Sequence, residues 1–510
     1  MTVAYGSHCC MLPAVGRRPS QVDRARRGPM RHAEKASIPS RYTVTRAGVI
    51  EMLAGRLQRG DVTPGDLLTR TLAMTREPAL EAVFLELCEE RADREARASA
   101  GRHRRGRPLG LLDGIPVAWK DLFDMAGLRT TAGSRLRLDS EPAREDAEAV
   151  QRLAAAGTVS VGKTNLSELA FSGLGLNPHF GTPANPWSTE QTRIPGGSSS
   201  GAAVAVATGA VPFAIGTDTS GSVRVPAAFT GLVGFKPTAG RYPQGGVYPL
   251  SRTLDRVGPL APSVRDAFLL DQALRGRRPS SPATPALRGV RVVVPEDPVV
   301  DDADAEVRAV FTRAVEALRE GGARISRMEM PSLQQARAAM RQYGSITAAE
   351  AYAFHRHALE RTGRAVMDPL VVMRLYEGRN MSAADLATLH CVAGEAQRSL
   401  RHELAGALLL IPTVPCLAPL ATPIAEDLDR AHRANRRVLA NTVLGSFLDL
   451  PGVAIPCGLN AEHRLPVSCL LCGASGEDAR VLATALAIED ALDDAGLWHS
   501  PAGRFLSEEL

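Results

Sequence analysis

The sequence predicts an α/β protein. Segments with helical spacing of apolar residues alternate with short apolar runs typical of buried strands, and this alternation extends through most of the 510 residues. No repeat of fixed period is present. The chain is 45% hydrophobic, so it can bury a large core and is neither disordered nor fibrous.

Both ends of the chain are predicted to be tails. Residues 1–45 carry eight Lys and Arg against two acidic residues and have no hydrophobic period, so we expect a disordered basic segment. An over-extended start with Met30 as the initiator, or a mitochondrial-type transit peptide, fits the same composition. Residues 501–510 are expected to form a short C-terminal tail.

Charge and cysteine usage limit the function classes. Residues 1–45 carry a net charge of +6 and the whole chain +5, so residues 46–510 carry 5 − 6 = −1. This near-neutral part gives no support to a nucleic-acid-binding surface. The eight cysteines are scattered. Neither a secretory h-region nor a stretch of ~18 apolar residues is present. We therefore expect a cytoplasmic protein without a membrane segment.

The folded part, residues 46–500, opens with helices. Residues 49–57 carry apolar side chains at helical spacing, and residues 63–66 (TPGD) combine an N-cap, a proline at the first helical position and an early carboxylate. A third helix is predicted over residues 84–100. Residues 108–262 then consist of short apolar runs broken by Gly, Ser and Pro, which is typical of buried strands and turns around a site.

The second half of the chain returns to a regular alternation of helices and strands. It follows a segment rich in Ser and Pro, residues 279–285. Its predicted strands are 289–295, 407–413, 452–456 and 467–471. Helices are predicted at 304–320 and 476–494, and residues 347–404 are predicted to be a largely helical stretch.

Residues 157–164 match the phosphate-binding pattern G-x-x-x-x-G-K-T letter for letter. A P-loop requires a strand before its first glycine, but residues 147–156 have helical spacing and Gly157 stands where a helix would end. The four residues that follow are β-formers, so they are predicted to form a strand. We therefore reject a nucleotide triphosphatase.

Two motifs rich in glycine and serine carry a more specific signal. GGSSSG (residues 196–201) contains Ser198, and GTDTSGSVR (residues 216–224) contains Ser222, 24 residues later. Either motif alone fits a glycine turn beside a packed helix. Together with GIPVAWKD (residues 114–121) they resemble the amidase signature family. The resemblance covers about residues 46–496 and continues through VGKTN (161–165), NPHFGT (177–182), GLVGFKPT (231–238), DRVGPL (255–260) and, more weakly, LPGVAIPCG (450–458).

The resemblance implies the amidase signature fold, with a large central mixed β-sheet covered by helices on both faces, and a Ser–cis-Ser–Lys triad. By position in the motifs, Ser222 is the nucleophile, Ser198 is the bridging serine after a cis peptide bond, and Lys120 is the base. The oxyanion is then received by backbone N–H groups of Thr219, Ser220, Gly221 and Ser222. The residues that match supporting polar positions are Ser199, Asp218 and Arg224, for which a purely structural ion pair or hydrogen bond is the alternative.

The triad places a physical demand on its lysine. A serine hydroxyl needs a neighbouring base, and no histidine lies in a usable motif with Ser222. A lysine with an ordinary pKa near 10.4 is neutral about once in a thousand at pH 7.4, so burial must lower its pKa to ~7–8. The apolar run before Lys120 can supply that burial. Only four of the 60 basic residues are lysines, and arginine cannot replace one as a base.

Four residues near the motifs receive less specific predictions. Members of the family often have glycine where this chain has Ser220, so a positive φ at this position would strain the serine. Lys163 and Lys236 are expected to make packing or carbonyl contacts. His179 is expected to be a hydrogen-bonded loop histidine.

Two further patterns could suggest a metal site. Cys469 and Cys472 form C-x-x-C on a predicted strand, where they would point to opposite faces. The His-Arg-His at residues 355–357 lacks the spacing of a zincin helix, and we expect it on a solvated helix face. The sequence therefore predicts no metal site.

The predicted function is an amidohydrolase that converts a carboxylic amide to a carboxylate and ammonia or an amine through an acyl-enzyme. No organic cofactor is expected, and the partner is a small-molecule amide whose pocket is shaped by residues 270–445. One alternative is the glutamine-amidase A subunit of a tRNA-dependent amidotransferase, the case in which nucleic acid would be involved. The other is a non-catalytic binding homologue. The sequence leaves open a homodimer.

Overall fold

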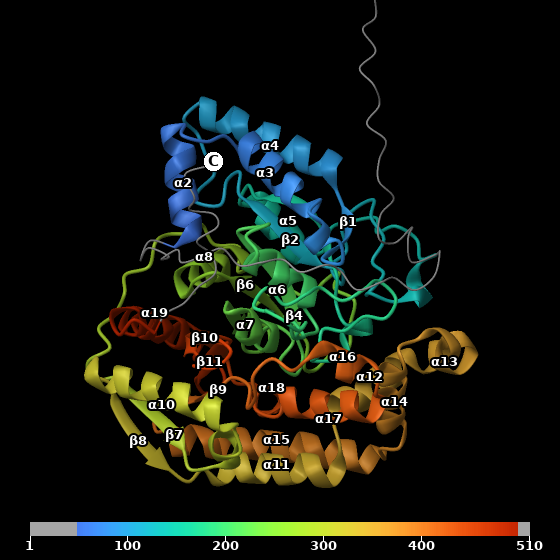
Figure 1. Ribbon diagram of the computed structural model, residues 1–510, viewed down its shortest axis with the longest axis vertical. Coiled ribbons are helices and arrows are strands. Elements are labelled where there is room, and N and C mark those ends of the chain that lie inside the picture. Colours follow the sequence, from blue (N-terminus) through green and yellow to red (C-terminus); the bar gives the residue numbers. More distant parts are fainter. Residues whose placement is uncertain (1–47, 498–510) are drawn as a thin grey trace, which may run out of the picture.

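A computed structural model describes residues 48–497, and Figure 1 shows its helices and strands. The predicted tails, residues 1–45 and 501–510, lie outside the described residues. The strands are β1 (Phe84–Leu87), β2 (Pro116–Lys120), β3 (Val159–Thr164), β4 (Phe213–Asp218), β5 (Val233–Lys236), β6 (Arg256–Ala261), β7 (Arg291–Pro295), β8 (Arg324–Met328), β9 (Leu408–Pro412), β10 (Gly452–Leu459) and β11 (Pro466–Cys472).

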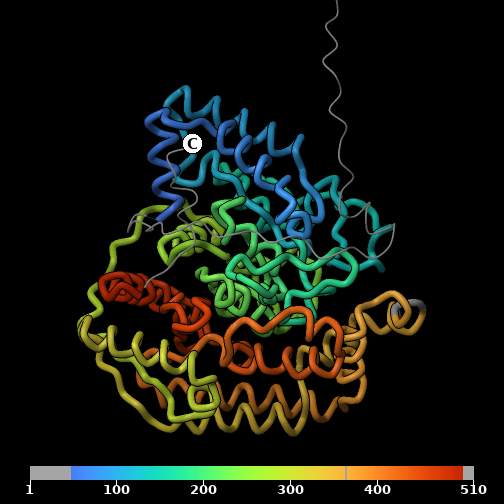
Figure 2. The backbone as a smooth tube through the Cα atoms, in the orientation of Figure 1, coloured from blue at the N-terminus to red at the C-terminus, as the bar shows by residue number. Residues whose placement is uncertain are grey.

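The described strands join into one mixed sheet, in the order β1-β3-β2-β4-β6-β5-β10-β11-β9-β7-β8. Strands from the first half of the chain lie on one side of β10 and β11, and β7 to β9 lie on the other. Figure 2 shows the same division, with the blue-to-green first half and the yellow-to-orange second half in opposite parts of the molecule. The two halves therefore share one sheet, although residues 279–285 separate them in sequence.

The helices surround this sheet, and none within residues 48–497 has both the length and the apolar composition to cross a membrane. They are α2 (Val49–Arg59), α3 (Pro64–Thr75), α4 (Glu89–Arg104), α5 (Glu148–Ala155), α6 (Ser200–Ala207), α7 (Arg224–Thr230), α8 (Val264–Leu274), α9 (Pro298–Asp301), α10 (Ala305–Glu320), α11 (Pro331–Tyr343), α12 (Ile346–Ala358), α13 (Arg364–Val366), α14 (Pro369–Arg379), α15 (Ala383–Leu404), α16 (Ala421–Ala425), α17 (Leu428–Leu439), α18 (Thr442–Phe447) and α19 (Asp478–Asp494).

Helices cover both faces of the sheet, as predicted. Successive strand residues point to opposite faces. On β2 and β4, Ala118 and Ala214 pack with the small residues of α6, whereas Trp119 and Ile215 pack in the cluster that contains α8. Because α6 contacts one set and α8 the other, the two helices lie on opposite sides of the sheet.

Strand direction brings several polar residues to one end of the central strands. β2 runs parallel to β4, whereas β6 runs antiparallel to β4 and pairs Asp218 with Arg256. The carboxyl ends of β2 and β4 therefore meet the amino end of β6. Lys120 ends β2, Asp218 ends β4, and Asp255 directly precedes β6.

Most predicted elements are confirmed, and one is wrong. The segment that matches a P-loop pattern forms the turn before β3 and the strand itself, which confirms the rejection of that motif. The helix predicted over residues 84–100 is wrong in its first turn. Phe84 to Leu87 form β1, which pairs with β3, and α4 begins at Glu89. A short apolar run has no period of its own, so pairing with β3 decided its conformation.

Candidate active site

Lys120 lies at the centre of the site and is fully buried. On β2 it shares the face of Ala118, so its side chain points toward the N-terminal end of α6. Its Nζ donates hydrogen bonds to Ser198 Oγ at 2.7 Å and to Thr217 Oγ1 at 2.9 Å. Burial lowers the pKa of Lys120 to about 7, although the carboxylates of Asp255 and Asp218 act in the opposite direction. The burial and the lowered pKa that the sequence analysis required of this lysine are therefore both present.

Ser198 stands two residues before α6, and its peptide bond with Gly197 is cis. The surrounding backbone is tightly packed. A Cβ on Gly197 would lie 2.5 Å from the amide nitrogen of Gly175 and 2.7 Å from Ser167 Oγ. The Ser167 N–H donates to the carbonyl oxygen of Ser198 at 3.1 Å. Glycine is therefore required before Ser198, and the serine hydroxyl is held against Lys120.

Residues 218–224, which we call the Asp218 loop, connect β4 to α7. The buried carboxylate of Asp218 accepts the Gly221 N–H at 2.7 Å and two N–H groups of the Arg224 side chain at 2.8 and 2.9 Å. Burial alone would raise the pKa of Asp218, but the charge and hydrogen bonds of Arg224 outweigh it and lower that pKa to about 2. The carboxylate is thus ionised, and the hydrogen-bond donors of the loop bind to it.

Ser222 lies on this loop beside the Ser198 segment. Ser199 donates its N–H to the carbonyl oxygen of Ser222 at 3.2 Å, and its Oγ donates to the carbonyl oxygen of Thr217 at 3.3 Å. The Ser222 side chain makes no hydrogen bond within residues 48–497, and the residue is 5% exposed. The structure therefore brings Lys120, Ser198 and the Ser222 backbone into one buried site and leaves the Ser222 hydroxyl unengaged.

The amides expected to receive an oxyanion are not equivalent. The Gly221 N–H is already donated to Asp218, so this one of the four predicted groups is engaged. In the described part of the chain, the N–H groups of Thr219, Ser220 and Ser222 have no hydrogen-bond partner. Ser220 does not have a positive φ, whereas Gly221 has φ +140°. The strain considered for Ser220 is therefore absent, and the glycine takes the unusual conformation instead.

Several residues of the site were missed by sequence reasoning. Thr217 accepts from Lys120, and Asp255 accepts the Thr219 hydroxyl at 2.6 Å. Ser220 contacts Thr347 and Thr442 from the second half of the chain. Thr217 and Asp255 lie in the quoted motifs, which could have drawn attention to them. The two second-half threonines lie in no motif, so no local signal identified them.

The other two lysines of the described residues, Lys163 and Lys236, make structural contacts. Lys163 Nζ donates to the carbonyl oxygen of Arg129 and lies 2.6 Å from Asp121 Oδ1. Lys236 Nζ donates to the carbonyl oxygen of Pro237 at 2.9 Å, and burial with the nearby charge of Arg224 lowers its pKa to about 8. The carbonyl contacts predicted for both are confirmed.

The predictions for the histidines and cysteines have different outcomes. His179 Nε2 lies 3.4 Å from Glu168 Oε1 but has no hydrogen-bond partner among the described residues, so the prediction of a hydrogen-bonded histidine is wrong for this nitrogen. The prediction of a solvated helix face is wrong for His355, which is 3% exposed and packs against Tyr248, although its two neighbours are exposed. Cys469 and Cys472 lie on β11 as predicted.

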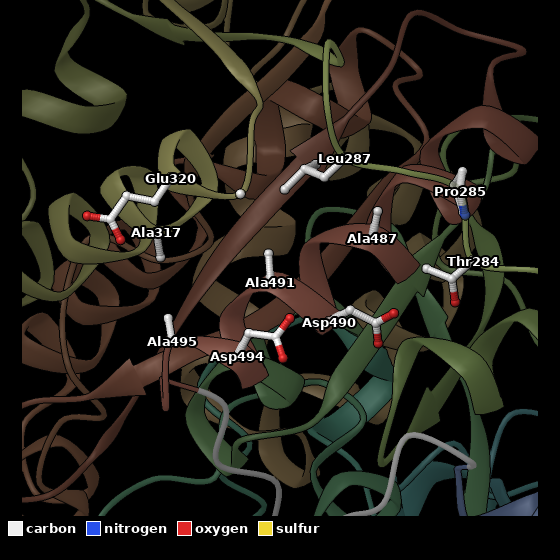
Figure 3. A pocket seen from close by; sticks show the side chains of 11 residues that line it. Thr284, Pro285, Leu287, Ala317, Glu320, Ala487, Asp490, Ala491, Asp494 and Ala495 are labelled. Carbon is white, nitrogen blue, oxygen red and sulfur yellow. The ribbon is translucent and has the colours of Figure 1, made fainter.

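Two features away from the site could also hold a ligand. Glu306, Glu462 and His463 place ligand atoms within 4.8 Å of one another in a partly exposed cluster. A cavity of about 420 Å³ lies between α10 and α19, as Figure 3 shows, and carries the carboxylates of Glu320 and Asp490. Neither feature includes a residue of the site around Lys120.

Comparison with known proteins supplies the family. The family model described as Amidase matches residues 69–482. The chain belongs to the amidase family. It is 38% identical over 395 residues to the 2-amino-5-chloromuconic acid deaminase of Comamonas testosteroni, a match that covers 75% of this chain and 83% of that protein.

Two further relatives of this amidase extend the match. It is 33% identical over 489 residues to the A subunit of the glutamyl-tRNA(Gln) amidotransferase of Chloroflexus aurantiacus, covering 88% of this chain and 97% of that protein. A crystal structure of an amidase has a TM-score of 0.77 and 33% identity, over 88% of this chain and 99% of the solved one. The predicted fold is confirmed, and the chain is an amidase, a hydrolase of carbon–nitrogen bonds.

We expect Asp218→Asn to destabilise the protein by about 3–5 kcal/mol, because it leaves the buried Arg224 guanidinium without a counter-charge. Chemical denaturation at pH 7 measures the loss. The matched control is Asp93→Asn, which breaks an exposed ion pair with Arg97 and should change stability by less than about 0.5 kcal/mol. Equal effects of the two substitutions would contradict the assigned role of Asp218.

Proposed function

We propose that the chain hydrolyses a carboxylic amide through a triad of Ser222, Ser198 and Lys120. One observation carries the proposal: a fully buried lysine with a pKa of about 7 lies 2.7 Å from the hydroxyl of Ser198. A lysine in this state is neutral in about half of the molecules at pH 7 and can accept a proton. The family membership supports the same assignment, and the hydrogen bond from the Ser199 N–H to the carbonyl oxygen of Ser222 places the proposed nucleophile beside the Ser198 segment.

The proposed reaction begins with a proton relay. Ser198 passes its proton to neutral Lys120 while it takes the proton of Ser222, and Ser222 Oγ attacks the amide carbonyl carbon. The oxyanion is received by the N–H groups of Thr219, Ser220 and Ser222, each worth ~3–4 kcal/mol in comparable sites. The proton returns through Ser198 to the leaving nitrogen, and ammonia or an amine departs. Water then cleaves the acyl-enzyme by the same relay.

The supporting residues have separate roles in this proposal. Asp218 and Arg224 shape the loop that carries the nucleophile, and Ser199 joins that loop to the Ser198 segment. The carboxylate of Asp255 accepts the hydroxyl of Thr219 and contributes negative charge near Lys120. No step requires a metal ion or an organic cofactor.

The substrate is proposed to be a small amide, and a second function is supported by one observation. The match to the amidotransferase protein covers 88% of this chain, more than the match to the deaminase, although the deaminase is more identical. A panel of aliphatic and aromatic amides, ureas and glutamine, read by ammonia or amine release, tests both. Turnover by the isolated chain supports the free-standing enzyme. Glutaminase activity that requires a partner protein would favour the amidotransferase.

We propose a cytoplasmic location and keep a homodimer as an open prediction. Six cysteines in the described part of the chain are free thiols, which suits a reducing compartment. Size-exclusion chromatography with light scattering would measure the oligomeric state.

We expect kcat/KM to increase with pH through an apparent pKa of about 7, because neutral Lys120 is the base. Below that pKa the rate should fall about tenfold per pH unit. Lys120→Arg should reduce turnover at least about 100-fold at every pH, since arginine keeps its proton. Unfolding transitions of both proteins check that the variant is folded. A folded Lys120→Arg variant that retains activity would refute the base assignment.

Asp255→Asn should move the acid limb of the profile, the fall of kcat/KM below about pH 7, to lower pH. The Asp255 carboxylate favours protonated Lys120, so its neutral isostere removes an interaction that raises the pKa of the lysine. The pH dependence of kcat/KM measures the shift. Asp146→Asn, which removes the partner of Arg91 elsewhere, should leave the limb in place. A limb that stays or moves upward in Asp255→Asn is the contrary result.

A fluorophosphonate probe should label the wild-type chain covalently, and Ser222→Ala should abolish labelling because the attacking oxygen is gone. Ser332→Ala is the matched control, since Ser332 is also buried and its hydroxyl donates to Glu403. Intact-mass spectrometry gives the adduct directly. If wild type is not labelled, or if Ser222→Ala is labelled, Ser222 is not the nucleophile.

A further inference from the structure

The Asp218 loop contacts two helices that come from the other half of the chain. Thr442, the first residue of α18, donates its hydroxyl to the carbonyl oxygen of Ser220 at 2.7 Å. Thr347, in the first turn of α12, lies with its Oγ1 3.2 Å from Ser220 Oγ. Both threonines are almost completely buried, and Ser220 is 8% exposed. These contacts bridge 222 and 127 residues of sequence, respectively.

The hydrogen bond from Thr442 completes the restraint of one peptide unit. The carbonyl oxygen of Ser220 accepts from Thr442, and the N–H of Gly221 in the same peptide donates to Asp218. A planar peptide bound at both ends cannot rotate without breaking one of these bonds. Its orientation limits the orientation of the two neighbouring amides, the N–H groups of Ser220 and Ser222.

α18 supports the loop at a second point. Ser446 lies four residues after Thr442, so the two side chains share one face of the helix. Ser446 Oγ accepts a hydrogen bond from the guanidinium of Arg224 at 2.8 Å, and Arg224 is the ion-pair partner of Asp218. One helix face therefore contacts both the carbonyl side of the loop and the cation that organises its carboxylate.

α12 is fixed to the first half independently of Ser220. Glu350 accepts the hydroxyls of Ser251 at 2.6 Å and Thr253 at 2.7 Å. These two residues belong to the segment that leads to Asp255, whose carboxylate accepts the Ser251 N–H at 3.0 Å. Thr347, one turn before Glu350, is thereby held at a constant position relative to the loop.

We propose that Thr442 and Thr347 are positioning residues for the oxyanion-binding amides of Ser220 and Ser222. Thr442 acts through the Ser220–Gly221 peptide, and Thr347 acts through the hydroxyl of Ser220. The inference rests on the proposed function and extends it to residues outside every catalytic motif. In this arrangement the hydroxyl of Ser220 contacts α12 through Thr347, a contact that a glycine at this position could not make. Since α12 and α18 both come from the second half of the chain, the structure of that half sets the geometry at which the nucleophile reacts.

Thr442→Val tests the proposal because valine keeps the shape of threonine and lacks the hydroxyl. We expect kcat and the rate of fluorophosphonate labelling to fall about tenfold, less than for the loss of a direct oxyanion donor. KM and the acid limb near pH 7 should stay unchanged, since the lysine is not affected. Thr442→Ser, which restores the hydroxyl, should recover most of the rate.

Thr230→Val is the matched control. Thr230 is fully buried at the end of α7, and its hydroxyl donates to the carbonyl oxygen of Pro226 at 2.7 Å, the same length as the Thr442 bond. This variant should keep kcat within about twofold, because it leaves the Ser220–Gly221 peptide restrained. Equal losses in the two valine variants, or an unchanged kcat in Thr442→Val, would overturn the role of Thr442.

The contact with Thr347 is tested by a double-mutant cycle with Ser220→Ala and Thr347→Val. If the two hydroxyls act through each other, the double variant should lose no more than either single variant, about threefold in kcat. Fully additive losses would remove Thr347 from the proposal. If Thr442→Val does not fold, this cycle still tests whether contacts from the second half of the chain to the Asp218 loop affect kcat. Failure of the wild type to label refutes the proposed function. Labelling at the wild-type rate in Thr442→Val, Ser220→Ala and Thr347→Val refutes only this inference.

Discussion

The carboxylate of Asp218 accepts the hydrogen bonds that determine the conformation of the loop around Ser222. It is buried, so its charge requires compensation, and the guanidinium of Arg224 supplies a second charge and two hydrogen bonds. The backbone N–H of Gly221 is drawn to the same carboxylate. Without this ion pair the loop would lose the hydrogen bonds that join Gly221 and Arg224 to Asp218. The arrangement of the site follows from that local electrostatic constraint.

The second constraint is the burial of Lys120. Removal from water favours the neutral amine, while the carboxylates of Asp255 and Asp218 favour the ammonium form. The two effects leave a pKa of about 7, which suits the role of base that we propose for Lys120. The order of strands β2, β4 and β6 produces this balance, because it brings the lysine and both carboxylates to the same end of the sheet.

The shared sheet explains why a site built from the first half depends on the second. β10 and β11 lie between the strands of the two halves, so neither half has a separate sheet. α18 precedes β10 in the chain, and it contacts the Asp218 loop through Thr442 and Ser446. A helix from outside the motifs can therefore influence a loop whose own sequence is closely defined by its motif.

By itself, the sequence determined the family resemblance and the α/β class, and it proposed Lys120, Ser198 and Ser222 as the triad, because these depend on local motifs and on periodicity. It misread Phe84 to Leu87, since only pairing with β3 makes that segment a strand. It also could not find Thr442 or distinguish the engaged Gly221 amide from its neighbours. Hydrogen bonds between residues more than 200 positions apart leave no local pattern, so only the tertiary structure shows that Thr442 and Ser446 contact the Asp218 loop from the second half of the chain.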